Sequence, residues 1–241
     1  AKGTGKTING AGTVAITALN GTANADLSNI TASSVTAAVD DDVTFTGTIG
    51  EAVVTVASGK TFTTTAAKVN GETLNGAGTV AITALDATAD ADLSNITASS
   101  VTANVANDVT FTGIIGSTVV SVHSGTTFTT TAAKVNGETL NGAGTVAITA
   151  LDATADADLS NITATSVTAN VAADVYFTGK IGNAVVTVAS GKTFITTAGS
   201  STQQSINGNH HQVIAELAGI SGYTGSITIT DADGTSIKAA D

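Results

Sequence analysis

The amino-acid sequence predicts an all-β fold, a β-solenoid (β-helix) built from three repeats. The stretch from Ala67 to Ala132 returns almost letter for letter from Ala133 to Ala198, and a more diverged copy occupies Ala1 to Ala66. Within each copy, apolar and polar residues alternate with a period of two, as in strands that bury one face. A repeated unit of 66 residues made of short strands is typical of a stacked array of modules.

Short alternating runs mark the strands, and copy two (67–132) illustrates them. The residues expected to face inward are Val80, Ile82, Ala84, Val101, Ala103, Val105, Val109, Phe111, Val120, Val122, Phe128, Thr130 and Ala132. Most residues between them are Thr, Ser or Asn, which suit a strand face in water. Asn-Gly pairs occur seven times in the chain and indicate turns, because both residues accept positive φ.

The strands also recur inside each copy. Ile82, Val101 and Val120 are spaced by 19 residues each, and the next equivalent, Ile148, follows after 28. This spacing predicts three coils per copy, the third lengthened by the segment AKVNGETLNG. Each coil is expected to form hydrogen bonds with the next around a narrow apolar interior.

Copies two and three provide an internal test of this expectation, because they differ at ten positions. Five of these lie at strand positions that we expect to face outward, and five lie in turns or at strand edges, so no inward residue is expected to change. The alternative is a tandem of three small β-sandwich domains. Domains of 66 residues without disulfides are only marginally stable, and no linker separates the copies.

The tail differs from the repeats. We expect repeats over 1–198 (1–66, 67–132 and 133–198) and a cap or the start of a different module over 199–241. The segment HHQVIAELAGI predicts a helix, with Asn209 as N-cap and Gly219 just beyond its end. Ser226 to Thr230 predicts a strand, followed by a turn.

The composition limits the partners. The chain has eight Lys, no Arg and nineteen acidic residues, with a net charge of −11, so nucleic acid is not an expected partner. Divalent cations fit such a surface. Cysteine is absent, which excludes disulfides and thiol chemistry, and no apolar run is long enough for a membrane span.

An acidic corner is the strongest chemical feature of the repeats. Its candidate metal ligands are Asp86, Asp90 and Asp92 in copy two and Asp152, Asp156 and Asp158 in copy three. Three carboxylates within seven residues of a turn offer the oxygen ligands that Ca²⁺ prefers. The alternative is a solvated turn in which Asp caps backbone N–H groups. Copy one has Asn20, Asn24 and Asp26 at these positions.

Three strings resemble repeats of a known class of proteins: ADLSNITA, VTFTGTIGEAVVTVASGKTFTTTA and ITITDADGTSIKAAD. They are similar to tandem repeats of very large secreted bacterial surface proteins, the RTX-like or calcium-binding adhesins. The resemblance implies type I secretion, an extracellular or cell-surface location and calcium-dependent folding. The nonapeptide GGxGxDxUx of calcium-binding RTX rolls does not occur in the chain.

Three functions follow as hypotheses. The first is a structural or adhesive extracellular segment, acting as a rigid spacer, surface-layer module or filament-forming unit. It would associate with itself or with cell-surface or matrix components. The second is a binding module for ice or polysaccharide through an outward Thr-rich face. The third, a β-helical lyase or hydrolase, is disfavoured because the acids repeat instead of forming one unique cluster, so we expect no enzyme.

Overall fold

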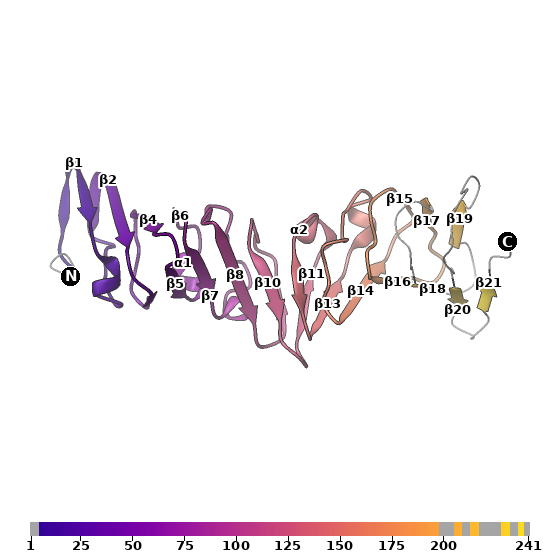
Figure 1. The fold of residues 1–241 in the computed structure, drawn as a ribbon. Coiled ribbons are helices and arrows are strands. Elements are labelled where there is room, and N and C mark those ends of the chain that lie inside the picture. Colours follow the sequence, from indigo (N-terminus) through magenta and orange to yellow (C-terminus); the bar gives the residue numbers. More distant parts are fainter. Residues whose placement is uncertain (1–4, 198–204, 209–212, 217–227, 232–235, 239–241) are drawn as a thin grey trace. The chain divides into compact units, whose positions relative to one another are not determined.

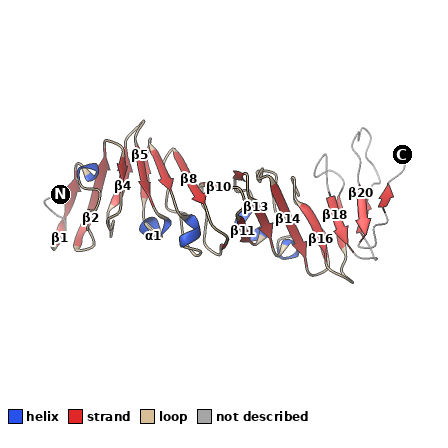
Figure 2. Cartoon of the chain, turned by 90° about the horizontal axis from the view of Figure 1, so that it is seen from below, coloured by secondary structure: helices blue, strands red, loops and turns tan. Residues whose placement is uncertain are grey.

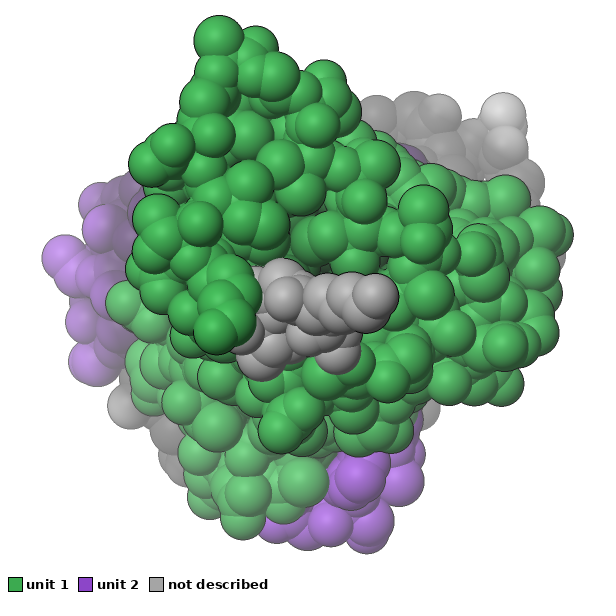
Figure 3. Space-filling model, turned by 90° about the vertical axis from the view of Figure 1, so that its left-hand side faces the viewer, with its two compact units in different colours: residues 1–121 green, residues 122–241 purple. Residues whose placement is uncertain are grey.

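A computed structural model describes residues 5–197, 205–208, 213–216, 228–231 and 236–238. The chain divides into two compact units, Ala1–Ser121 and Val122–Asp241, shown in green and purple in Figure 3. The repeats do not coincide with these units, since the boundary falls within copy two. The two units are described in turn.

The regular secondary structure of unit 1 is mainly short parallel strands, which are joined by turns (Figures 1 and 2). Its strands are β1 (Ile8–Ile16), β2 (Ile30–Val39), β3 (Val43–Thr44), β4 (Val53–Val56), β5 (Thr61–Thr64), β6 (Leu74–Gly76), β7 (Thr79–Ile82), β8 (Ser100–Val105), β9 (Val109–Thr110) and β10 (Val119–Val122), whose last residue begins unit 2. One sheet has the order β1-β2-β4-β6, and β3, β5, β7 and β8 follow one another in a second. Single turns of helix, η1 (Leu19–Gly21), α1 (Ala66–Val69) and η2 (Leu85–Ala87), lie between strands.

Unit 2 repeats this organisation. Its elements are β11 (Thr127–Thr130), α2 (Ala132–Val135), β12 (Leu140–Gly142), β13 (Thr145–Ile148), η3 (Leu151–Ala153), β14 (Ser166–Val171), β15 (Val175–Phe177), β16 (Val185–Val188), β17 (Phe194–Thr197), β18 (Ser205–Gly208), β19 (Val213–Glu216), β20 (Thr228–Asp231) and β21 (Ser236–Lys238). The ladder β11-β13-β14-β16-β18-β20 is parallel throughout, and β15-β17-β19 forms a second parallel sheet. The last pair, β20 and β21, is antiparallel.

The strand register confirms the β-solenoid. Phe62 of β5 pairs with Val80 of β7, and Val80 pairs in turn with Val101 of β8, so each strand lies beside its equivalent in the next coil. In unit 2 the same register joins Phe128, Val146 and Val167. The tandem β-sandwich alternative is wrong, because sandwiches of that kind are built from antiparallel sheets.

The interior is narrow and apolar, as predicted. Twelve of the thirteen inward residues predicted for copy two are buried, whereas Ala84 is only partly buried. The largest fully buried side chains include Phe45, Phe62, Phe111, Phe128, Phe177 and Phe194. Burial alternates along the strands, for example buried–exposed–buried–exposed–buried from Val101 to Val105 in β8. Burying apolar surface at about 25 cal/mol per Å² is therefore the main stabilising contribution in each coil.

A glycine two residues after Phe45, and another two residues after Phe111, allow the coils to pack this closely. A Cβ on Gly113 would lie 2.7 Å from Cζ of Phe111 and would overlap the carbonyl oxygen of Ala91 in the neighbouring coil. Gly47 has the same surroundings beside Phe45. Real Cβ atoms do not approach this closely, so the sequence TG after each of these Phe residues is a packing requirement.

Two details of the sequence interpretation are wrong. Residues Val213–Glu216 form the strand β19, parallel to β17, where we predicted a helix; the flanking residues 209–212 and 217–227 lie outside the described residues. Val213 and Ile214 are β-branched, and pairing with β17 outweighs their helical spacing. The predicted C-terminal strand is present as β20. Second, one of the ten differences between copies two and three, Thr118 against Ala184, falls on a buried position, although we expected no inward residue to change.

Candidate functional site

The acidic corner begins at the turn of 3-10 helix that follows β7 and β13. Leu85 is buried at the start of η2 and anchors the turn, which leaves Asp86 partly exposed. Oδ1 of Asp86 accepts a hydrogen bond from the N–H of Ala106 in the next coil at 3.1 Å, and Oδ2 accepts one from Nδ2 of Asn107 at 2.7 Å. Both oxygens of Asp86 therefore join two coils.

The same bond recurs in all three copies. In copy three, Oδ1 of Asp152 accepts the N–H of Ala172 at 2.8 Å. In copy one, the amide oxygen of Asn20 accepts the N–H of Asp40 at 3.1 Å. A neutral amide oxygen thus accepts the same backbone hydrogen bond as a carboxylate oxygen does. The shared property is an acceptor for a backbone N–H group, not a negative charge.

The last acid of the corner stabilises a local turn. Oδ1 of Asp92 accepts hydrogen bonds from the N–H and the hydroxyl of Ser94, at 3.0 and 2.6 Å. The N–H of Asp92 donates to Oδ1 of Asn70 at 2.8 Å. Asp26 has the same bonds to Ser28, and they hold the pKa of the Asp26 carboxyl below its ordinary value. This is the hydrogen bonding of an Asx turn.

Copy three adds an ion pair at this position. Nζ of Lys180 lies 2.6 Å from Oδ2 of Asp158, whose Oδ1 accepts bonds from Ser160. The hydrogen bond from Lys180, followed by those from Ser160, lowers the pKa of Asp158 to about 2. In copy one the equivalent residue is Thr48, which forms an isolated β-bridge with Asp26. In copy two it is Ile114, which forms an isolated β-bridge with Asp92. Only copy three can form this pair, because Thr48 and Ile114 carry no charge.

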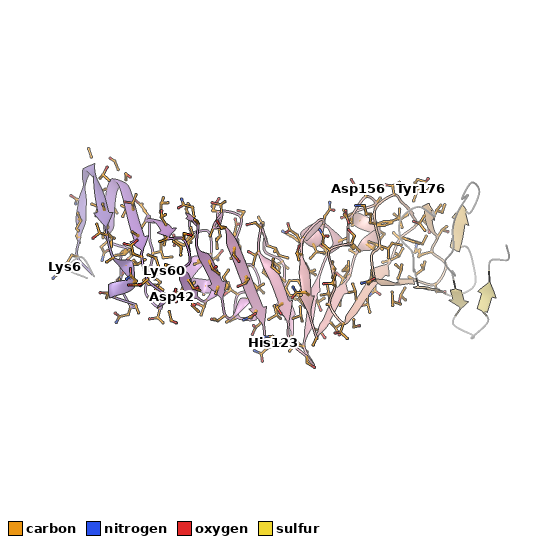
Figure 4. All side chains as sticks on the ribbon, viewed as in Figure 1. Lys6, Asp42, Lys60, His123, Asp156 and Tyr176 are labelled. Carbon is orange, nitrogen blue, oxygen red and sulfur yellow. The ribbon has the colours of Figure 1, made fainter. Side chains whose placement is uncertain are left out.

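The middle acids, Asp90 and Asp156, are exposed; Asp156 is labelled in Figure 4. Across the residues that the structure describes, no three acidic or His side chains gather closely enough to hold a metal ion. The structure therefore places each set of three predicted ligands at the equivalent turn of its own copy without bringing three carboxylates together. Calcium binding stays a prediction from the sequence.

The acidic run Asp40–Asp42 of copy one also joins coils. Nζ of Lys60 lies 2.7 Å from Oδ1 of Asp41, and this bond raises the pKa of Lys60. The N–H of Thr61 donates to Oδ1 of Asp42 at 2.8 Å, as the N–H of Thr193 does to Asp174 in copy three. Figure 4 labels Lys60 and Asp42 in this part of unit 1.

Two partly buried acidic residues were not singled out from the sequence. Glu72 and Glu138 follow the single helical turns α1 and α2, and partial burial raises the pKa of both carboxyls. The sequence signal was a single acid within the AKVNGETLNG excursion, which lengthens the third coil. Two copies of one perturbed acid at equivalent positions indicate a property of the repeat and not a unique catalytic group.

The outward Thr residues form rows across neighbouring coils. In unit 1, Thr61 pairs with Thr79 and then with Ser100, which gives a row of hydroxyls. The adjacent row contains Thr63, Ala81 and Thr102, so its middle member lacks a hydroxyl. In copy three Tyr176, which is 52% exposed, replaces the outward Thr of β9.

The fold defines the chain as a β-solenoid repeat protein. No protein-family model, curated protein or solved structure matches it. Within its described part, the longest helices are single turns, and none has the length and apolar character needed to cross a bilayer.

Proposed function

We propose that the chain is a structural segment of an extracellular bacterial protein, a stiff spacer or adhesive module that grows in length by adding repeats. The observation that carries this proposal is the use of the polar side chains. The corner acids and amides repeat with the copies, and at three equivalent positions they accept the backbone N–H of the next coil. Side chains that are used to join coils support a mechanical role.

The repeat offers the properties that such a spacer needs. Each coil forms parallel backbone hydrogen bonds with the next, and the aliphatic and Phe residues on the inward side are buried. Because each coil contacts only its neighbours, further copies can be added without changing the packing of existing ones. An outward surface rich in Thr and Asp keeps the array in solution.

Extension by repeats is the direct test. We would insert one further copy of residues 67–132 between copies two and three and measure the maximum dimension by small-angle X-ray scattering. Three more coils at about 4.8 Å each should add roughly 14 Å. A chain with a Gly/Ser insert of the same length is the matched control, because a flexible insert gives no fixed increment. An extra copy that adds no such increment would refute the spacer function.

Binding of ice or polysaccharide is the second candidate, and the hydroxyl row of Thr61, Thr79 and Ser100 favours it. A repeated row on a sheet presents hydroxyls at the strand spacing of about 4.8 Å. Thermal hysteresis and a glycan array would test the two ligands, with Thr79→Lys as a variant that interrupts the row. Activity that this variant abolishes would promote the second candidate over the first.

A further inference from the structure

Copy three carries an apolar pair on its outward face where the other two copies have threonine. Tyr176 of β15 and Ile195 of β17 lie in register on adjacent parallel strands. Tyr176 is 52% exposed (Figure 4), and Ile195 is partly exposed. The equivalent residues of copy one, Thr44 and Thr63, are in register in the same way. A phenol ring and an aliphatic side chain therefore replace a pair of hydroxyl groups.

The same change continues along the row. Ile195 pairs in turn with Ile214 of β19, which is placed here by backbone register alone. In the other two copies the residue at this point of the row is Ala81 or Ala147. Three successive strands of unit 2 thus carry Tyr, Ile and Ile at positions that elsewhere hold Thr, Thr and Ala.

The interior of the coils does not require this change. The inward neighbours Phe177 and Phe194 are fully buried and form the same tilted ring pair as their equivalents in copy one. The core is therefore kept while the outward residues differ. Because half of the Tyr176 side chain stays in water, a ligand that covers the ring would gain the free energy of burying it.

A lysine close to this pair has lost the partner that it has in copy one. Lys60 of copy one forms an ion pair with Asp41 at 2.7 Å. The equivalent residues of copy three are Lys192 and Ala173. Within the described part of the chain, no carboxylate lies within ion-pair distance of Lys192, which is partly exposed. Its ammonium group can therefore donate hydrogen bonds to a ligand.

Polar groups lie on both sides of the apolar pair. Lys192 precedes Ile195 by three residues, which is about 10 Å along the strand direction. On the other side, the N–H of Thr178 donates to the carbonyl of Ala155 at 2.7 Å, and the next residue is the exposed Asp156. A hydrogen-bond donor and an acceptor therefore flank the Tyr ring, and a ligand rich in hydroxyl groups can use both.

The size and charge of this surface favour a neutral polysaccharide over other partners. One aromatic side chain buries about 150–250 Å², whereas a stable protein interface uses about 800 Å² from each partner. The net charge of −11 opposes polyanions such as nucleic acid or an acidic polysaccharide. A sugar ring offers an apolar C–H face for an aromatic ring and hydroxyl groups around its edge.

We propose that Tyr176 and Ile195 form the platform of a binding site for a neutral polysaccharide. A sugar ring stacks on Tyr176, and the ammonium group of Lys192 donates a hydrogen bond to a hydroxyl of the same chain of sugars. The site rests on the adhesive function proposed above and names its class of ligand. Extension by repeats does not involve these residues, so either proposal can fail while the other stands.

Tyrosine fluorescence reports on the platform directly. The chain has no Trp and two Tyr residues, Tyr176 and Tyr223, so the full chain with Tyr223→Phe emits from Tyr176 alone. We would titrate it with hydroxyethyl cellulose, laminarin, dextran and a soluble galactomannan, and with alginate as the anionic probe. At least one neutral polysaccharide should change the emission in a saturable manner. It should also retard the parent chain in affinity electrophoresis.

The other copies supply substitutions that the fold already accommodates. Tyr176→Thr, the residue of both other copies, should weaken binding at least about tenfold, as loss of an aromatic anchor does. Lys192→Thr, the residue of copy two, should weaken it about fivefold through loss of one hydrogen bond. Thr79→Lys in unit 1 is the matched control and should leave this binding unchanged. Urea melts check that each variant folds.

Transfer of the site to copy two is the converse experiment. Thr110→Tyr and Thr129→Ile, together with Asn107→Ala and Thr126→Lys, reproduce the residues of copy three and should double the stoichiometry. A transfer without added binding would overturn the assignment to these residues. So would the absence of binding to all four neutral polysaccharides, binding that Tyr176→Thr leaves intact, or binding of alginate alone.

Discussion

The rings of Phe45 and Phe62 lie in neighbouring coils of unit 1, with centroids 5.3 Å apart and planes inclined by 31°. Phe177 and Phe194 repeat this arrangement in unit 2, at 5.7 Å and the same inclination. The two pairs have the same separation in sequence and come from different copies of the repeat. Tilted ring pairs of this kind add stability beyond the burial of their area.

Phe45→Ala should lower the free energy of unfolding by about 3–5 kcal/mol, the usual range for a buried Phe. Phe45 is 1% exposed and contacts the Phe62 ring. Thr44→Ala, at the exposed position beside it, should be nearly neutral. Urea melts of the two variants are the measurement, and equal losses would contradict the assignment of inward and outward faces.

Thr118→Val should raise the free energy of unfolding by about 1 kcal/mol. Thr118 is 1% exposed, and its hydroxyl has no hydrogen-bond partner, while copies one and three have Ala at this position. Valine keeps the shape and removes the unsatisfied group.

The matched control is Thr64→Val, since Thr64 is equally buried but donates its hydroxyl to the carbonyl of Phe45 at 3.0 Å. Thr64→Val should lower the free energy of unfolding by about 1 kcal/mol. Thermal or urea melts compare the two. If both substitutions change the free energy of unfolding in the same direction, hydrogen bonding of the hydroxyl does not determine the effect.

The fold could be predicted from the sequence because the same alternation of apolar and polar residues occurs in all three copies. Val80, Val101 and Val120 could be assigned to the interior from alternation and spacing, and all are buried. The copies added independent support, since exposed positions such as Thr110 vary more freely than Phe111. Thr118 escaped this reasoning because its burial depends on the closing of a turn, which periodicity does not describe.

The tail was harder to predict because it occurs once. The stripe of Val213, Ile214 and Leu217 fits a helix by spacing, whereas pairing with β17 makes Val213–Glu216 a strand. A long-range partner decided the outcome, and local propensity could not reveal it.

The candidate site was also predicted only in part. The positions of the acids along the corner were foreseen, but their use as acceptors for the next coil depends on coil-to-coil register.

The Asp158–Lys180 pair predicts a difference in titration between copies. Asp158 should titrate with a pKa of about 2, below its ordinary value of 3.8, and Lys180→Ile, the residue of copy two, should raise that pKa. Because the pKa is lower in the folded state, the pair stabilises the fold above about pH 4 and loses this contribution as the pH falls through about 2. Both side chains are partly exposed, so the contribution should be below about 1 kcal/mol.

Carboxyl NMR titrations of the parent chain and of Lys180→Ile would measure this difference. Asp26, which has the Ser28 bonds but Thr48 in place of a lysine, is the internal reference. An Asp158 pKa that does not respond to loss of Lys180 would contradict the ion pair as its main cause.

The calcium prediction now ranks the three copies. Affinity in an oxygen site depends on the charge of its ligands. Copy one has Asn20 and Asn24 in place of two carboxylates, so it should bind most weakly. In copy three, the ammonium group of Lys180 already lies on Asp158 and would compete with a cation. Copy two has Ile114 at that position and should bind most tightly.

Calorimetry with Ca²⁺ against a chelated control tests this order, and bound calcium should also raise the melting temperature. Asp92→Asn should then remove most of the binding heat, while Asp158→Asn should remove less. A cation at Asp86 or Asp92 would compete with the hydrogen bonds that these carboxylates accept from Ala106 and Ser94, and this competition weakens its binding. If calcium produces neither heat nor a shift in melting, the corner acids are turn residues whose oxygens serve the backbone alone.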